Sequence, residues 1–168
     1  MNAAGFSNAV AHHGAAEHTA SEVVGRLDPK AFHFAFIDPF NLSSLPFSVI
    51  ETLSKLKRAD LLIHFSVMDF NRNLEAASNS GLLERFAPDW QKAANRTLGV
   101  NGFRRKVFKH WLDLIRSLGF AEVSDFIPPV QNSGGADIYW LVLASRHKLA
   151  DKLWKVAADV EPQNSFQF

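Results

Sequence analysis

A run of apolar residues from Ala31 to Phe40 dominates the hydrophobic pattern of the chain, and it ends in a carboxylate, a proline and an aromatic ring. A continuous apolar run between turn residues is typical of a strand buried on both faces, as in a parallel sheet covered by helices. Polar residues at the carboxyl end of such a strand lie where open α/β sheets bind their ligands. The pattern therefore predicts a central strand and marks Asp38 as a candidate functional residue.

The residues on either side of this run predict a βαβ unit. Helical spacing predicts helices over Glu17–Leu27 and Val49–Leu56, and a second apolar run predicts a buried strand over Leu61–Val67. A strand, a helix and a second strand within about 35 residues should place the two strands parallel, with a right-handed crossover. Ala9–His13 is a candidate short strand near the start of the chain.

The second half of the chain predicts helices followed by a hairpin. The segment Met68–Gly102 is typical of a lid or a substrate-shaping insertion. Asn101 is the expected N-cap of a long helix, and Gly119 follows that helix where glycine is favoured. A Gly-rich connection makes the last two strands antiparallel. The expected elements are a polar loop (Asp69–Asn73), two short helices (Ser80–Phe86 and Asp89–Thr97), a long helix (Phe103–Leu118), two strands (Glu122–Val130 and Asp137–Ser145) and a final helix (Leu149–Ala158).

Composition narrows the class of protein. The 168 residues suffice for a single domain over 1–168, with 159–168 as a tail, and 47% of them are hydrophobic. The formal net charge of +1 removes bulk electrostatic attraction to nucleic acid or to anionic lipid as an argument. The chain contains no cysteine, so it forms no internal disulfide and no thiolate metal site. No membrane-spanning run and no signal-peptide pattern occur, and we expect a cytoplasmic protein.

The order of predicted elements resembles the second half of a class I methyltransferase-type Rossmann sheet, over residues 14–158. The resemblance implies an α/β fold: a partial Rossmann-like sheet, mostly parallel with a C-terminal antiparallel hairpin, with helices on both faces. It also implies that Ile138–Ala144 is inserted between its neighbours. Four stretches resemble the three-Cys-motif partner proteins (the TcmP family): Phe36–Phe40, Ala59–Phe65, Asn71–Leu74 and Tyr139–His147.

The family resemblance implies a cofactor and a partner. The cofactor would be S-adenosylmethionine, and the partner would carry a three-cysteine, radical-SAM-like motif. Nothing before Gly14 corresponds to the strand and glycine-rich turn that would hold this cofactor. Gly14 and Ala15 are the candidate cofactor-binding residues, although an alanine stands where an acidic contact is expected. The chain thus resembles a truncated homologue that lacks the cofactor-binding half.

Asp38, Pro39 and Phe40 are the candidate catalytic residues. They resemble the Asp/Asn-Pro-Pro-aromatic turn of amino-methyltransferases, with one proline where the stricter motif has two. In that turn, the side-chain oxygen orients the amine that receives the methyl group, and the ring stacks on a planar substrate. The alternative interpretation is that Asp38 caps the following turn and Phe40 belongs to the core.

Four residues near the same predicted crevice are candidate substrate-binding residues: Asn41, His64, Asp69 and Arg72. The alternatives are structural. Asn41 can cap a helix, a histidine in a buried strand is usually satisfied by one hydrogen bond, and charged residues in loops are commonly solvated.

Two other polar clusters, a histidine pair and a basic cluster, offer different chemistry. His12 and His13 could ligate a metal, but adjacent strand residues point to opposite faces, and no metal site is predicted. A basic cluster of four residues could meet nucleic-acid phosphates, although a solvated helix face explains it as well. Its members are Arg104, Arg105, Lys106 and Lys109.

Two functions therefore remain open. In the first, the chain is methyltransferase-like and inactive alone, and Asp38 orients an acceptor. In the second, it is a non-catalytic interaction module for a three-cysteine partner or for nucleic acid. Missing strands before Phe32–Ile37 would leave that strand with an unpaired edge, which predicts self-association into a homo-oligomer.

Overall fold

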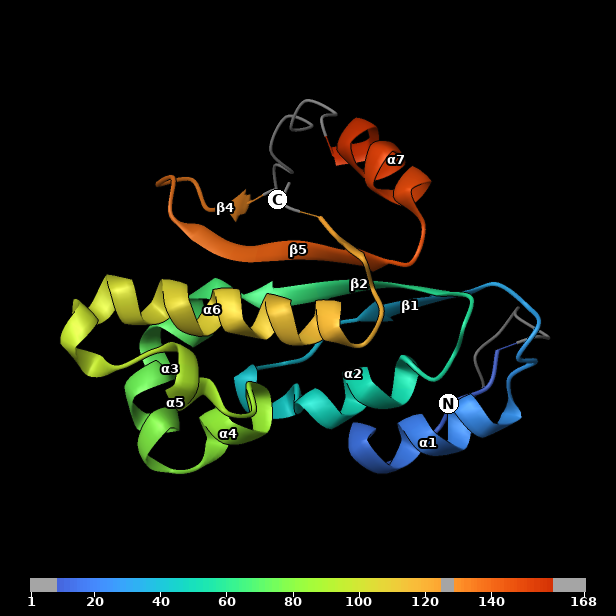
Figure 1. Ribbon diagram of the computed structural model, residues 1–168, viewed down its shortest axis with the longest axis horizontal. Helices are drawn as coiled ribbons and strands as arrows, with labels where there is room; N and C mark the ends of the chain where they lie inside the picture. The colour runs from blue at the N-terminus through green and yellow to red at the C-terminus, as the bar shows by residue number, and fades with distance from the viewer. Residues whose placement is uncertain (1–8, 125–128, 159–168) are drawn as a thin grey trace.

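A single open sheet of five strands organises the computed structural model, which describes residues 9–124 and 129–158. The strands follow one another in the order β1-β2-β5-β3, and β4 also pairs with β5 (Figure 1). β5 is therefore the strand around which the second half of the sheet is assembled. The strands are β1 (His33–Ile37), β2 (Ala59–Ser66), β3 (Glu122–Val123), β4 (Pro129–Gln131) and β5 (Asp137–Ser145).

Strand direction confirms one expectation and overturns another. β1 and β2 are parallel, with His33 opposite Ala59, as the βαβ pattern predicts. β5 runs antiparallel to β2, β3 and β4, so the sheet is mostly antiparallel and the prediction of a mostly parallel sheet is wrong. The reason is that β5, the second strand of the hairpin, pairs not only with β4 but also with β2 and β3, so one reversed strand accounts for every antiparallel pair. A hairpin forces antiparallel pairing, whereas another helical crossover would have allowed a parallel strand.

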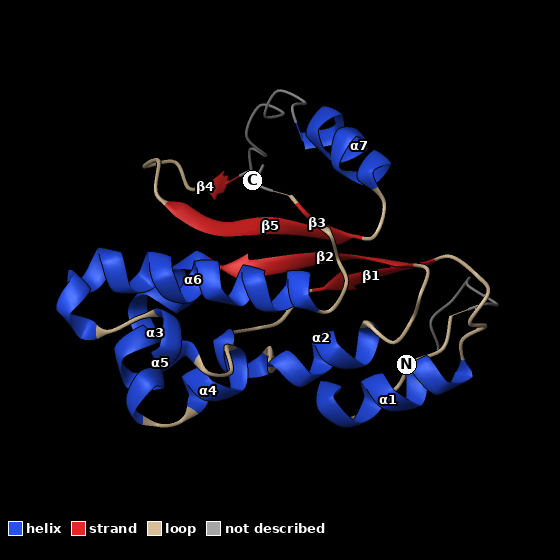
Figure 2. Cartoon of the chain, in the orientation of Figure 1, coloured by secondary structure: helices blue, strands red, loops and turns tan. Residues whose placement is uncertain are grey.

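Helices cover the two faces of the sheet unequally (Figure 2). Six helices lie on one side, and α7 (Lys148–Ala158) lies on the other, packed on β3 and β5. Phe65 of β2 is at the centre of the core on the first side. The helices of that side are α1 (Ala16–Arg26), α2 (Phe47–Leu53), α3 (Val67–Asn79), α4 (Leu82–Phe86), α5 (Trp90–Ala93) and α6 (Gly99–Ser117), with 3₁₀ turns η1 (Leu42–Ser44) and η2 (Arg96–Leu98). The rings around Phe65 belong to Phe70, Phe86, Phe108, Trp111 and Trp140.

β1 is an edge strand with one open face. Ala35 and Ile37 pack against the core, whereas Phe34 and Phe36 are 64% and 57% exposed. Successive side chains of a strand point to opposite faces, and at β1 the described helices cover only one of them. The prediction that Ala31–Phe40 is buried on both faces is therefore wrong. Among the described residues β1 pairs only with β2, as expected for an unpaired edge.

The segment after β2 is helical and not a polar loop. Asp69–Asn73 lies inside α3, where the Ser66 side chain accepts a hydrogen bond from the Asp69 amide and caps the helix. The apolar residues of α3 recur with helical spacing and are buried against the core: Val67, Phe70, Leu74 and Ala77. The segment predicted to be a lid thus forms packed helices that complete the core.

Smaller differences concern element ends. Ala9–His13 forms no strand, and Asn101 lies within α6, which Leu98 precedes as N-cap. Gly119 has a φ of 90°, the left-handed conformation expected after a helix. The strand predicted over Glu122–Val130 is divided into β3 and β4, and residues 125–128 between them lie outside the described part. No helix in the described ranges is long and apolar enough to cross a membrane.

Candidate functional site

The carboxyl ends of β1 and β2 bring Asp38 and His64 together. Ile37 lies opposite Ile63 in the parallel register, so the next residue of each strand is also adjacent. Asp38 Oδ1 and His64 Nδ1 are 2.6 Å apart, and their side chains are 62% and 20% exposed. The ring of Tyr139 on β5 meets the imidazole edge-on at a centroid distance of 4.2 Å. Two predicted site residues thus form one carboxylate–imidazole pair, held by three adjacent strands.

One carboxylate oxygen of this pair remains able to accept a hydrogen bond at the surface. Asp38 Oδ2 makes no hydrogen bond within the described residues, so it can accept one from a ligand. Phe40 is 93% exposed and lies outside the core. The cap of the following turn is Asn41 and not Asp38, because Asn41 Oδ1 accepts from the Ser44 amide at 3.0 Å. Both structural alternatives for Asp38 and Phe40 are therefore wrong.

The pair has little enclosed space beside it. A hollow of about 10 Å³ is lined by Pro39 and His64, among others, and this is room for about one water molecule. His64 Nε2 is buried and makes no hydrogen bond with the described residues. An acceptor could therefore bind only on the open surface formed by Asp38 and Phe40.

Asn41 and Asp69 hold the backbone in place. Asp69 Oδ2 accepts from the Leu42 amide at 2.7 Å, and its Oδ1 accepts from Asn73 at 2.6 Å. These bonds fasten the turn after β1 to the first turn of α3. The oxygens of both side chains are already engaged, and in this structure they hold the turn that follows Phe40 against the start of α3.

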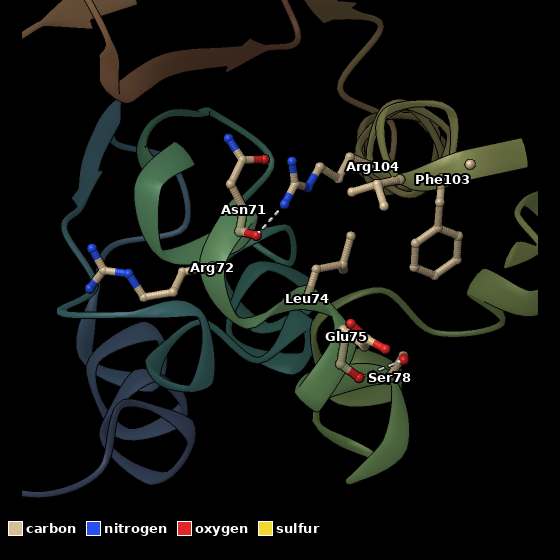
Figure 3. Close-up of a pocket in the computed structure, with 9 residues that line it drawn as sticks. Asn71, Arg72, Leu74, Glu75, Ser78, Phe103 and Arg104 are labelled. Atoms are coloured by element: carbon tan, nitrogen blue, oxygen red, sulfur yellow. Dashed lines mark hydrogen bonds between the residues drawn. The ribbon is translucent and has the colours of Figure 1, made fainter.

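The remaining predicted site residues are not brought to this pair. Arg72 is exposed on α3 and points away from Arg104 in Figure 3. Ala15 is the N-cap of α1, where its carbonyl accepts from the amide of Thr19 at 3.1 Å. Gly14 precedes it with a φ of 144°. Within the described residues, the contacts of Gly14 and Ala15 thus belong to the start of α1, and none of them reaches Asp38.

The histidine pair near the start of the chain is divided. His12 Nδ1 lies 3.7 Å from Glu22 Oε1, and His13 is exposed. Within residues 9–124 and 129–158, no group of three or more histidine or carboxylate side chains is arranged to hold a metal ion.

A second feature, which the sequence did not predict, is a pair of adjoining hollows between α3 and α6. One is about 440 Å³ in volume and is lined by Leu74, Phe103 and Arg104, among others (Figure 3). The Arg104 guanidinium donates to the Asn71 carbonyl and joins the two helices. Beside it lies a groove of about 830 Å³ that extends to β5. The helical spacing of the apolar residues in α3 was the signal that could have predicted these walls.

Among the described residues, the carboxylate at the rim of the larger groove is that of Asp137. Hydrogen bonds from Gln131 and then from Trp140 hold the pKa of Asp137 below its usual range. Asp137 therefore stays ionised at neutral pH, with its oxygens already occupied by these two donors.

The comparisons with known proteins add no neighbour. No family model matches the chain, and neither a curated protein nor a solved structure shows a significant match to it.

Proposed function

We propose that this chain is the acceptor-binding half of a methyltransferase-like Rossmann sheet of the TcmP kind. The strand order supports this proposal. Two parallel strands are followed by a hairpin whose last strand is inserted next to β2, as the resemblance to class I methyltransferases implies. The carboxyl end of β1 then carries Asp38, where such sheets bind their ligands.

The observation that carries the proposal is the exposed pairing of Asp38 with His64. One carboxylate oxygen is held at 2.6 Å by the imidazole, and the other remains able to accept from an amine. The ring of Phe40 is exposed two residues later and can stack on a planar acceptor. Fixed orientation of this kind is a main source of rate in group transfer, because it removes the entropy of alignment.

The methyl donor, in this proposal, is not bound by the described residues alone. The sheet stops at β1 within the described part, and the donor-binding strand would lie beyond that edge. Gly14 and Ala15 serve the start of α1. Any partner with a three-cysteine motif would supply its own cluster, since this chain contains no cysteine.

Two titrations test the proposal. Isothermal calorimetry with S-adenosylmethionine should show no saturable heat for this chain alone. Adenine, a planar ring with an exocyclic amine, should shift the nuclear magnetic resonance signals of Asp38, Phe40 and His64. The Asp38→Ala variant should abolish these shifts, and Asp28→Ala, which removes another exposed carboxylate, should leave them intact. Saturable donor binding, or unchanged signals at millimolar adenine, would contradict the proposal.

A second candidate function is an interaction module that binds a second copy through β1. Phe34 and Phe36 of β1 are 64% and 57% exposed, and Phe32 just before it is 63% exposed; within the described residues β1 pairs only with β2. Together the three rings offer roughly 350 Å² of apolar surface per copy. This is nearly half of the about 800 Å² per partner that a stable interface buries, and main-chain pairing along the edge would add to it. The oligomeric state in solution tests this candidate, as developed in the Discussion.

A further inference from the structure

The larger groove has three walls from distant parts of the chain. The start of α3 forms one wall with Met68, Asn71 and Arg72. The first half of α6 forms the second, and the turn between β4 and β5 forms the third, which ends at Asp137 and Trp140. Its volume of about 830 Å³ lies within the range of roughly 300–1,000 Å³ typical of sites for small ligands.

The groove collects arginines without partners. Among the arginine side chains that the structure describes, only Arg72 and Arg105 have no recorded hydrogen bond, ion pair or ring contact, and both line this groove. Every other described arginine is engaged: Arg26 with Glu22, Arg58 with the Lys30 carbonyl and Phe32, Arg85 with Glu17, Arg104 with the Asn71 carbonyl, Arg116 with Asp113, and Arg146 with backbone carbonyls and Phe120. Free guanidinium groups are the donors that best match phosphate oxygens.

Arg104 adds a third cation to the same groove. Its Nη2 donates to the Asn71 carbonyl, while its Nε is buried and makes no hydrogen bond with the described residues. Within the described residues, the carboxylate that lines this groove is that of Asp137, whose oxygens are taken by Gln131 and Trp140. Three arginines and one aspartate that is already satisfied thus line the described part of the groove, which has a positive balance.

The groove also has an aromatic wall. The ring of Trp140 is stacked on Phe65 at a centroid distance of 5.8 Å and an interplanar angle of 18°, and its indole N–H donates to Asp137. Phe108 meets it edge-on at 4.9 Å. Trp140 and Phe108 are both only half-buried, so part of each ring faces the groove. Rigid aromatic surface beside cationic side chains suits a flat base attached to a phosphate.

We propose that this groove binds a nucleoside phosphate, with Arg72 and Arg105 on the phosphate and Trp140 against the base. The shared chemistry is a phosphate ester carrying an aromatic base, whether in a free nucleotide or in one unit of single-stranded RNA. The proposal does not depend on methyl transfer or on Asp38, because none of its contacts involves the carboxyl end of β1.

Titration with adenosine monophosphate tests the proposed site, and the nuclear magnetic resonance signal of the Trp140 indole N–H is the local readout. We expect a saturable shift of this signal, identified by its loss in Trp140→Phe, while the signal of the fully buried Trp111 stays unchanged. Arg105→Ala and Arg72→Ala should each weaken binding by roughly tenfold, as expected for one charge-assisted hydrogen bond. Lys106→Ala is the matched control, because it removes a cation from the neighbouring position of α6 that does not line the groove.

Further probes distinguish a free nucleotide from an RNA strand and define the results that would contradict the proposal. Tighter binding of hexa-uridylate than of adenosine monophosphate would assign the groove to an RNA strand, and equal or weaker binding would assign it to a free nucleotide. Inorganic phosphate that binds as tightly as the nucleotide would overturn the role of the base. An equal loss in Lys106→Ala, or no shift of Trp140 with any probe, would overturn the site. Neither result bears on the adenine titration at Asp38, which tests the proposed acceptor function separately.

Discussion

The exposed phenylalanines of β1 make a quantitative prediction about self-association. If a second copy pairs along this edge, Phe34→Ser should weaken the dimer strongly and leave the monomer fold intact. Phe34 is 64% exposed in a single chain, so little of its surface contributes to the core. The same exposed surface becomes a source of binding energy once another β1 strand lies beside it.

The magnitude follows from the exposed area. A phenylalanine side chain carries roughly 200 Å² of surface, so about 130 Å² of Phe34 is open to solvent. If strand pairing covers about half of that, the substitution removes about 1.5 kcal/mol per copy at 25 cal/mol per Å². A symmetric dimer contains two such sites and loses about 3 kcal/mol, which corresponds to a dissociation constant raised by roughly two orders of magnitude.

Sedimentation equilibrium over a concentration series measures this constant. Val100→Ser is the matched control, since Val100 is 65% exposed on α6, far from β1 in the sequence and not part of this edge. It should leave the constant unchanged. The prediction is refuted if the wild-type chain stays monomeric at high micromolar concentration. It is also refuted if the Phe34→Ser variant dimerises as tightly as the wild type.

Three further substitutions test the fold that supports the site. Phe65→Ala should lower the free energy of unfolding by about 3–5 kcal/mol in urea titration, because it empties the centre of the aromatic core; a loss below 1 kcal/mol would contradict this placement. Asp69→Ala should cost about 1–3 kcal/mol by leaving the Leu42 amide without its acceptor, and Asp69→Asn should recover part of that loss. The hydrogen bond from Lys155 holds the pKa of Asp151 below its usual range, so its stabilisation is present above the unfolded value and is lost as the pH falls through the folded value. The wild type should therefore exceed Asp151→Asn in stability at pH 7 and lose that advantage in acid, below the usual titration range of an aspartate. A difference that stays constant with pH would argue against the assignment.

The positions and order of the main elements were predictable because they follow from local patterns. The βαβ unit, α6 with Gly119 after it, and the terminal hairpin all depend on periodicity and turn residues within one segment. The carboxyl ends of β1 and β2 were placed correctly as neighbours for the same reason. Parallel pairing then made the meeting of Asp38 and His64 a geometric consequence.

The faces of β1 were not predictable from its residues. Phe34 and Phe36 alternate there with His33, Ala35 and Ile37, and the size of the rings alone would turn them toward the core. In the fold, Ala35 and Ile37 face the core instead, because the register with β2 decides which set of side chains meets the helices. Register depends on the whole sheet and cannot be derived from five residues.

The groove was missed because Asp69–Asn73, which lies inside α3, was predicted to be a polar loop. Asn71, Arg72 and Asn73 are poor evidence for a helix by themselves, and burial of Phe70 and Leu74 against the core decides the conformation. Without α3 there was no wall opposite α6, and the basic cluster resembled an ordinary solvated face. Tertiary packing therefore outweighed local helix propensity in α3, and α3 is the helix on which the groove depends.

The position of β5 also affects how the protein can be synthesised. β2 leaves the ribosome early, but its pairing partner β5 is synthesised much later. Leu61 of β2, for example, pairs with Ala144 of β5. Until then the nascent chain presents β1 and β2 as a two-stranded apolar ribbon with both outer edges open. Closure of so distant a pairing is slow, and such ribbons are prone to aggregate or to engage chaperones. Chains that end before β5 should therefore aggregate or be degraded. Synthesis of β5 is then the step after which the chain can reach its native state.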